Sequence, residues 1–132
     1  MKIIALTGTS DCGKTTTLNM VYLNVLSLDG ISTNKRPLVG DLNDFSDIVL
    51  YNNQKIAFFT MGDYSVYVVN AIRDYNNQGV DLLICACNSW FVRPFTEMAK
   101  YPHNILNKTV ASPSSDELTS NTNDAISIFG LI

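Results

Sequence analysis

Residues 2–15 read KIIALTGTSDCGKT. The first part of this segment is a short apolar run, which predicts a strand that is buried on both faces. Its last eight residues, from Gly8 to Thr15, fit the pattern G-x-x-x-x-G-K-[ST] in full. Residues 14–28 continue with apolar side chains at helical spacing. This apolar stripe consists of Leu18, Val21, Tyr22, Val25 and Leu28. A strand, a glycine loop and a helix in this order predict a loop that binds phosphate.

Each residue type in the loop has a physical reason. Glycines let the backbone adopt positive φ and approach a phosphate closely, and the following helix adds its positive N-terminal end. Lys14 supplies a charge for the β- and γ-phosphates, and the Thr15 hydroxyl is a candidate magnesium ligand. Thr16 is placed to reach the α-phosphate. The candidate nucleotide-binding residues, including one glycine discussed below, are Gly8, Thr9, Ser10, Asp11, Cys12, Gly13, Lys14, Thr15, Thr16 and Gly62.

The segment resembles the P-loop NTPase superfamily over residues 2–28, with a weaker match over residues 46–88. The resemblance implies a nucleoside triphosphate and Mg²⁺ as ligands. Partition-type ATPases carry a second lysine in the loop, but Ser10 stands at that place here. The sequence therefore departs from that subgroup.

Members of the superfamily usually carry an acidic residue at the end of another apolar strand. The candidate segment here is IAFFTMGD, residues 56–63. In small GTPases the similar segment reads Asp-x-x-Gly, which matches Gly62 but puts Phe59 at the position of the aspartate. Asp63 is therefore our prediction for a metal ligand and catalytic carboxylate, although it can also cap the following helix. Asp41 and Asp44 are weaker candidates, because turn-forming aspartates are usually solvated.

The remaining pattern predicts an α/β fold in one domain, residues 1–132. Strands are expected at 47–51 and 55–60 as a hairpin, at 80–87 as a central strand, and at 104–110, with a short one near Leu38-Val39. Helices are expected at 63–78, at 94–101 and from a cap at 112–117 to Phe129. We expect a three-layer, P-loop NTPase-like sandwich with a mostly parallel sheet of about five strands and one antiparallel edge strand. The hairpin is similar to the GTPase and small-kinase branch, in which the strand ending near Thr60 lies beside the phosphate-loop strand.

Base recognition and catalytic arginines are less marked in the sequence. Asn-Lys-x-Asp would indicate guanine, but residues 107–110 read NKTV. This favours ATP over GTP, with residues 111–115 as a base-side loop by analogy. Arg93 is a candidate catalytic cation for the transferring phosphoryl group. The alternative is a surface arginine stacked on an aromatic ring, and Arg36 and Arg73 carry the same two interpretations.

Composition excludes several classes of function. The formal net charge is -3, and the nine basic residues form no block, so a nucleic-acid partner is not expected. No apolar run is long enough to cross a bilayer, and the N-terminal run is too short for a secretory signal, so we expect no membrane partner and a cytoplasmic location. Three cysteines and one histidine argue against a zinc site.

Three functions therefore stay open from the sequence. The first is a compact Mg²⁺-dependent ATPase, which can act as a switch with a protein partner. The second is a small-molecule kinase whose acceptor site would come from residues 31–46 and 88–101. The third is a non-catalytic nucleotide-binding module whose ligand orders residues 31–46.

Overall fold

The computed structural model describes residues 1–39, 41–110 and 116–132. The chain alternates between strands and helices, as predicted for an α/β fold. The strands are β1 (Lys2–Gly8), β2 (Ile31–Ser32), β3 (Arg36–Pro37), β4 (Phe45–Tyr51), β5 (Gln54–Phe59), β6 (Leu82–Asn88) and β7 (His103–Asn107). The helices are α1 (Lys14–Ser27), α2 (Ser65–Asn77), α3 (Arg93–Met98) and α4 (Glu117–Phe129).

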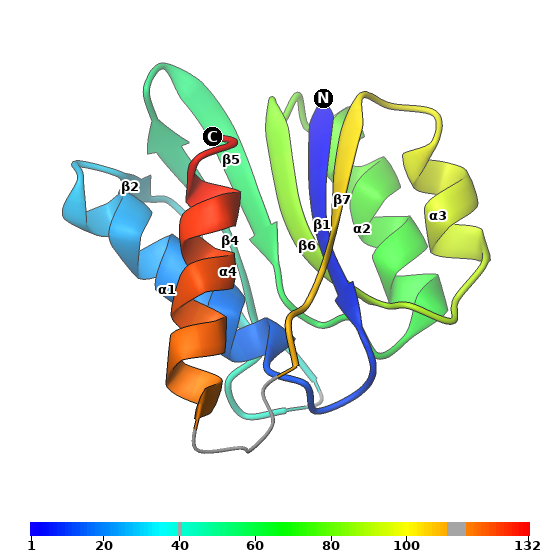
Figure 1. Ribbon diagram of the computed structural model, residues 1–132. Helices are drawn as coiled ribbons and strands as arrows, with labels where there is room; N and C mark the ends of the chain where they lie inside the picture. The colour runs from blue at the N-terminus through cyan, green and yellow to red at the C-terminus, as the bar shows by residue number, and fades with distance from the viewer. Residues whose placement is uncertain (40, 111–115) are drawn as a thin grey trace.

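The elements form three layers around one sheet (Figure 1). Helices α1 and α4 cover one face and bury the cluster around Leu18, Tyr22 and Ile84. Helices α2 and α3 cover the other face, where Ile72, Leu83 and Met98 are buried. The expected layered arrangement is therefore confirmed.

The sheet is mixed, so the prediction of a mostly parallel sheet with about five strands is wrong. In the described part of the chain it has seven strands, in the order β2-β4-β5-β6-β1-β7 with β3 also paired to β4. Strands β5, β6, β1 and β7 are parallel to their neighbours in that order. Strands β2, β3 and β5 all pair antiparallel with β4. Strand β4 therefore lies inside the sheet, whereas we expected the antiparallel strand at its edge. The short strands β2 and β3 escaped prediction because two-residue strands have no apolar period.

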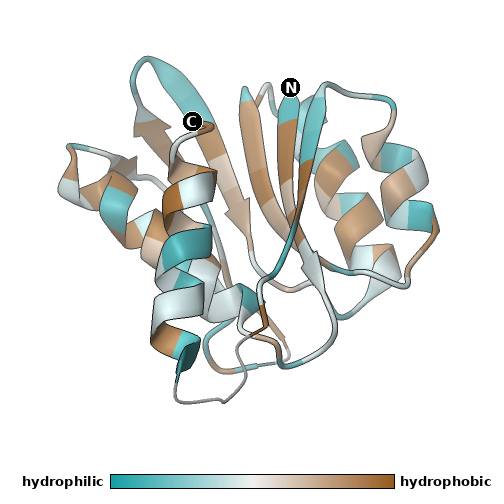
Figure 2. Cartoon of the chain, viewed as in Figure 1, coloured by the Kyte–Doolittle hydropathy of each residue, from teal (hydrophilic) through white to brown (hydrophobic). Residues whose placement is uncertain are grey.

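Strand β6 takes the place beside β1 that we had expected for β5. All seven of its residues are buried, and Figure 2 shows the central strands as hydrophobic along most of their length. A strand that is apolar on both faces suits the centre of a sheet that helices cover on both sides. The strand order places β6 there, between β5 and β1. The expectation that β5 lies next to β1 is therefore wrong, whereas the prediction of a central strand at 80–87 is confirmed.

Smaller differences concern the ends of elements. The segment at Leu38-Val39 is not a strand, and Leu28, expected on the apolar stripe of α1, follows that helix and is exposed. The predicted cap at 112–115 lies outside the described residues. Among the described residues, no helix is both long and apolar enough to span a membrane.

The fold brings several loops to one end of the sheet. The loop from Gly8 to Lys14, the segment before β4 and the start of α4 meet at the carboxyl ends of the parallel strands, at the lower edge of Figure 1. This is the edge at which ligands of open α/β sheets bind.

Candidate functional site

The loop between β1 and α1 depends on its second glycine. Gly13 adopts φ 97° and occupies the cap position of α1. A Cβ atom at Gly13 would lie 2.7 Å from Asn121 Oδ1, so a side chain there would be strained by the positive φ and would require the Asn121 amide to move. The glycine thus lets the chain turn into α1 while α4 packs directly against it.

Lys14 is folded back onto the loop and is 6% exposed. Its Nζ donates hydrogen bonds to the carbonyl oxygens of Thr9 at 2.6 Å and Gly8 at 3.3 Å. A third bond goes to Asn88 Oδ1 at 3.2 Å. The ammonium group is therefore held at the loop, beside the space where a phosphate would lie.

Thr15 contacts a buried carboxylate. Its hydroxyl donates to Asp44 Oδ1 at 2.8 Å, and the hydroxyl of Thr60 donates to the same oxygen at 2.9 Å. Asp44 is only 3% exposed, although it lies just before β4. Thr60 is fixed in turn by the backbone N–H of Phe45, which donates to its hydroxyl oxygen at 2.9 Å. Three separate segments thus place one carboxylate beside the start of α1.

A cavity of about 240 Å³ opens at this place. Its wall includes the loop and helix residues from Asp11 to Thr16, together with Thr60, Gly62 and Asn121. One cationic side chain, Lys14, lines it. The acidic side chains that line it are Asp11, Asp41, Asp44, Asp63 and Glu117. Such an excess of carboxylates favours a bound cation over a bare anion.

Those carboxylates are too dispersed to hold a metal by themselves. Among the described residues, no three His, Cys, Asp or Glu side chains form a group that can hold a metal ion. Mg²⁺ commonly takes one or two protein carboxylates and completes its shell with phosphate oxygens and water. Thr15 and Asp44 fit that kind of site.

The remaining predicted residues differ in whether they line the cavity. Gly62 and Asp63 both line the cavity, but Asp63 is exposed, and the carboxylate on Thr15 belongs to Asp44. The alternative role of Asp63 as a helix cap is wrong, because Tyr64 occupies the cap position of α2. Thr9 and Ser10 contribute through a carbonyl and a hydroxyl behind the cavity wall.

In the described part of the chain, no arginine lines this cavity. Arg93 is the exposed first residue of α3 and does not line this cavity. Arg73 pairs with Glu97 at 3.1 Å, and Arg36 donates to Asn34. Hydrogen bonds from Arg73 and Lys100 hold the pKa of Glu97 below its ordinary value. These contacts connect surface helices and loops and give no cation to the cavity.

Sequence reasoning missed Asn88, the last residue of β6. Its side chain is 2% exposed and contacts Lys14, as described above. Its backbone N–H donates to the carbonyl of Gly62 at 3.0 Å. A Cβ atom at Gly62 would lie 2.6 Å from the carbonyl carbon of Ala86, so this glycine permits the close approach of the two backbones. A polar residue at the end of an all-apolar strand was the available signal.

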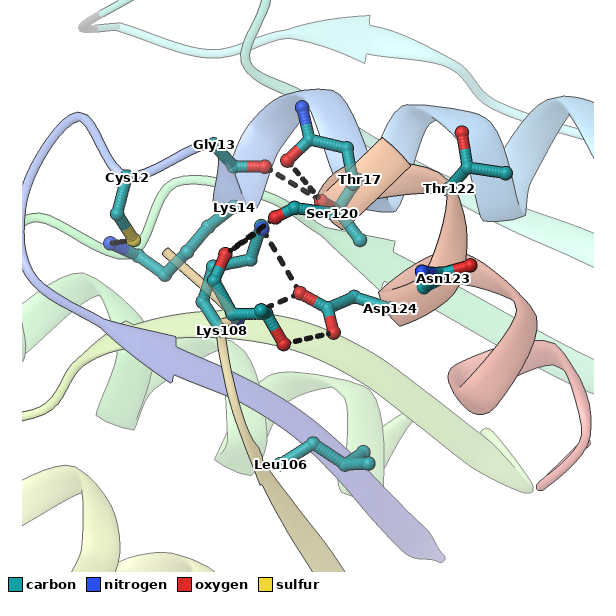
Figure 3. Close-up of polar contacts among 12 residues, drawn as sticks. Cys12, Gly13, Lys14, Thr17, Leu106, Lys108, Ser120, Thr122, Asn123 and Asp124 are labelled. Atoms are coloured by element: carbon teal, nitrogen blue, oxygen red, sulfur yellow. Dashed lines mark hydrogen bonds and ion pairs between the residues drawn. The ribbon is translucent and has the colours of Figure 1, made fainter. Parts of the chain in front are cut away.

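Helix α4 braces the loop from the side (Figure 3). Lys108, which follows β7, has a side chain that is 1% exposed and pairs with Asp124 of α4 at 3.0 Å. Asp124 also accepts hydrogen bonds from the N–H and hydroxyl of Thr109, both at 2.8 Å. One turn earlier in α4, Asn121 accepts a bond from Thr17 of α1. The helix is thereby tied both to the strand end and to the phosphate-loop helix.

Two ionisable groups near the loop have shifted pKa values. Burial alone would raise the pKa of Asp124, but the hydrogen bonds from Lys108 and Thr109 outweigh it and hold that pKa below its ordinary value. Burial raises the pKa of the Cys87 thiol to about 12, despite the opposing charge of Lys14. Cys87 is therefore a neutral thiol at physiological pH.

A second cavity of about 570 Å³ lies between the β3–β4 segment and α2. Phe59 and Met61 line it, while Thr60 between them lines the candidate site. None of the residues predicted for nucleotide binding line this second cavity.

Comparison with known proteins adds no assignment. No family model matches the chain, and searches of curated proteins and of solved structures return no significant match. The functional argument therefore depends on the residues and their geometry.

Proposed function

We propose that this protein binds a nucleoside triphosphate with Mg²⁺ in the cavity at the start of α1, and that its fold is a member of the P-loop NTPase superfamily. The observation that carries the proposal is the 2.8 Å contact between the Thr15 hydroxyl and Asp44. A hydroxyl and a carboxylate side by side are oxygen ligands of the kind that bind Mg²⁺ together with a phosphate, which supports the proposal. Lys14 lies beside them in the loop that the sequence pattern predicted.

The charge distribution supports a metal-bound ligand. Five carboxylates line the cavity against one ammonium group, so a triphosphate alone would be repelled. Mg²⁺ reduces the negative charge of the phosphates and brings its own attraction for Asp44. We therefore propose the Mg²⁺ complex as the ligand.

ATP is the preferred nucleotide in this proposal. Residues 107–110 lack the aspartate of a guanine-binding motif, and the Lys108 ammonium is engaged by Asp124. A lysine buried in an ion pair is not free to contact a base. The predicted base-side loop at 111–115 lies outside the described residues.

Hydrolysis of the γ-phosphate follows as the proposed activity. Lys14, the loop N–H groups and Mg²⁺ would stabilise charge in the transition state while water attacks. Asp63, at the exposed side of the cavity, is the candidate for orienting that water.

Phosphate release is the test of this activity. We expect the wild-type protein to release inorganic phosphate from ATP with Mg²⁺, and Lys14→Ala to lower that rate about 100-fold. Glu117→Gln, at the rim of the cavity, is the matched control and should keep most of the rate. Equal rates for the wild-type protein and Lys14→Ala would remove hydrolysis from the proposal.

A non-catalytic switch is the second candidate. The segment before β4 supplies Asp44 to the site, while its neighbour Leu42 is fully exposed. A ligand that recruits Asp44 would therefore act directly on the surface segment that exposes Leu42. Saturable binding of ATP without phosphate release would favour this function. The kinase alternative has less support, because none of the described residues 88–101 line the cavity.

A further inference from the structure

Asn88 lies where three parts of the candidate site meet. In the sheet it is in register with Gly8, the first residue of the phosphate loop. Its side-chain oxygen accepts a hydrogen bond from Lys14, and its amide nitrogen donates to the Ser10 hydroxyl at 3.5 Å. Its backbone N–H donates to the carbonyl of Gly62, which lines the cavity. One buried residue thus contacts the loop, the cation and the segment that follows β5.

A phosphate that binds Lys14 would compete with Asn88 for the N–H donors of the ammonium group. An ammonium group has three N–H donors, and in this structure Gly8, Thr9 and Asn88 accept them, with the Cys12 sulfur 3.8 Å away. A phosphate oxygen that binds Lys14 must replace at least one of these acceptors. Among the described residues, Asn88 provides the only side-chain oxygen that accepts from this ammonium group, and a side-chain amide can turn away without moving the loop backbone.

The turn that follows Asn88 leads directly to the surface. The N–H of Ser89 donates to the carbonyl of Gly8 at 3.1 Å, and the N–H of Phe91 donates to the carbonyl of Asn88 at 3.3 Å. Trp90 lies between them, is 69% exposed, and has its ring 4.6 Å from the ring of Phe91. Both ends of this turn therefore depend on residues of the phosphate site.

We propose that Asn88 is a positioning residue that holds Lys14 ready for a phosphate and transmits phosphate binding to the Trp90 turn. The inference rests on the proposed function, because it needs a ligand phosphate beside Lys14. When the phosphate takes the Lys14 ammonium, the Asn88 amide loses its partner and reorients, and residues 88–91 adjust with it. Phosphate binding would thereby change the conformation around Trp90 and Phe91.

The test uses the single tryptophan of the chain as the reporter. Fluorescence of Trp90 is followed during titration with Mg²⁺-ATP, and the same titration is repeated by calorimetry, which reports binding independently of Trp90. The variants are Asn88→Ala, which removes the amide, and Asn88→Asp, which keeps its shape and adds a charge. Asn107→Ala is the matched control, because Asn107 ends β7 on the other side of β1 and bonds Thr7 rather than Lys14. A thermal melt of each variant shows that it is folded.

We expect a saturable fluorescence change in the wild-type protein and in Asn107→Ala. Asn88→Ala should lose most of that change while calorimetric affinity stays within about threefold, since the bond it removes is a neutral acceptor of modest net strength. Asn88→Asp should weaken binding about tenfold or more, because a carboxylate competes with the phosphate for Lys14 through a charge-assisted bond.

Four results would overturn the inference. An undiminished fluorescence change in Asn88→Ala shows that Asn88 does not transmit binding, and wild-type affinity in Asn88→Asp shows that it does not compete for Lys14. Calorimetric binding by the wild-type protein without any Trp90 response would remove the inference and leave the proposed function standing. No calorimetric binding of Mg²⁺-ATP would remove both.

Discussion

At the scale of the residue, the proposed magnesium site depends on Asp44 rather than on Asp63. Asp44 is buried and accepts hydrogen bonds from Thr15 and Thr60 through one oxygen. Asp63 is exposed at the same cavity. In the proposed site, a buried carboxylate that already contacts the Thr15 hydroxyl would coordinate Mg²⁺ with little rearrangement, whereas the Asp63 carboxylate would act at the exposed side.

Neutralising Asp44 should therefore weaken metal-dependent binding. We expect Asp44→Asn to lower the affinity for Mg²⁺-ATP between about 10- and 100-fold, the usual range for loss of a metal-site partner. Isothermal titration calorimetry with Mg²⁺ in excess measures this affinity. The matched variant Asp63→Asn should change it by less than about threefold, since its carboxylate is solvated. A larger loss in Asp63→Asn than in Asp44→Asn would restore Asp63 as the metal ligand.

At the scale of the element, helix α4 stabilises the loop end of the sheet. The Lys108–Asp124 pair joins it to the end of β7, and the bond between Thr17 and Asn121 joins it to α1. Because the Lys108 side chain is 1% exposed, its charge depends on Asp124 for compensation. The pair is thus a structural device beside the site.

Breaking this pair should lower the free energy of unfolding. We expect Asp124→Asn to lose about 3 kcal/mol, because it leaves a buried ammonium group without its carboxylate. Urea unfolding followed by circular dichroism measures the difference. Asp74→Asn on the exposed face of α2 is the control and should lose less than about 0.5 kcal/mol.

The pH dependence gives the same pair a separate signature. The folded-state pKa of Asp124 lies below its ordinary value, so its stabilising contribution is complete above about pH 4 and is lost as pH falls through the lower, folded-state pKa. The stability gap between the wild-type protein and Asp124→Asn should therefore shrink on acidification below about pH 4. A gap that stays constant down to pH 2 would show that the carboxylate charge is not the cause.

The elements differ in how well they could be predicted from the sequence. Buried strands such as β1 and β6 and the helix α1 follow from apolar runs in the sequence, and they were predicted. The place of β6 beside β1 could not be predicted, because the order of strands is set by which side chains fill the space between layers. Asp44 was underrated for a similar reason, since its partners Thr15 and Thr60 lie 29 and 16 residues away in the chain.

At the scale of the whole molecule, the acidic side chains of the cavity lie at the edge of the sheet where the parallel strands end. The chain carries a net charge of -3, and five carboxylates gather at one cavity around Lys14. The parallel strands β1 and β6 end there, and so do the loops that carry those side chains (Figure 1). We therefore propose that this site favours a ligand that brings a divalent cation.

Removing Mg²⁺ should consequently abolish most of the nucleotide affinity. We expect EDTA to weaken ATP binding about 100-fold or more, because the phosphates then face the carboxylates without a compensating charge. Calorimetric titration with and without the chelator measures the effect, and restoration by added Mg²⁺ is the control. Equal affinity in both conditions would contradict a metal-dependent site.

Calorimetric titration of Mg²⁺-ATP into the wild-type protein and into Lys14→Ala tests the proposed nucleotide site, with thermal melts to show that both proteins are folded. We predict one saturable site in the wild-type protein, with affinity at least about 100-fold weaker in Lys14→Ala. This proposal is contradicted if the folded wild-type protein binds neither ATP nor GTP with Mg²⁺. Equal affinity in the two proteins would contradict it as well.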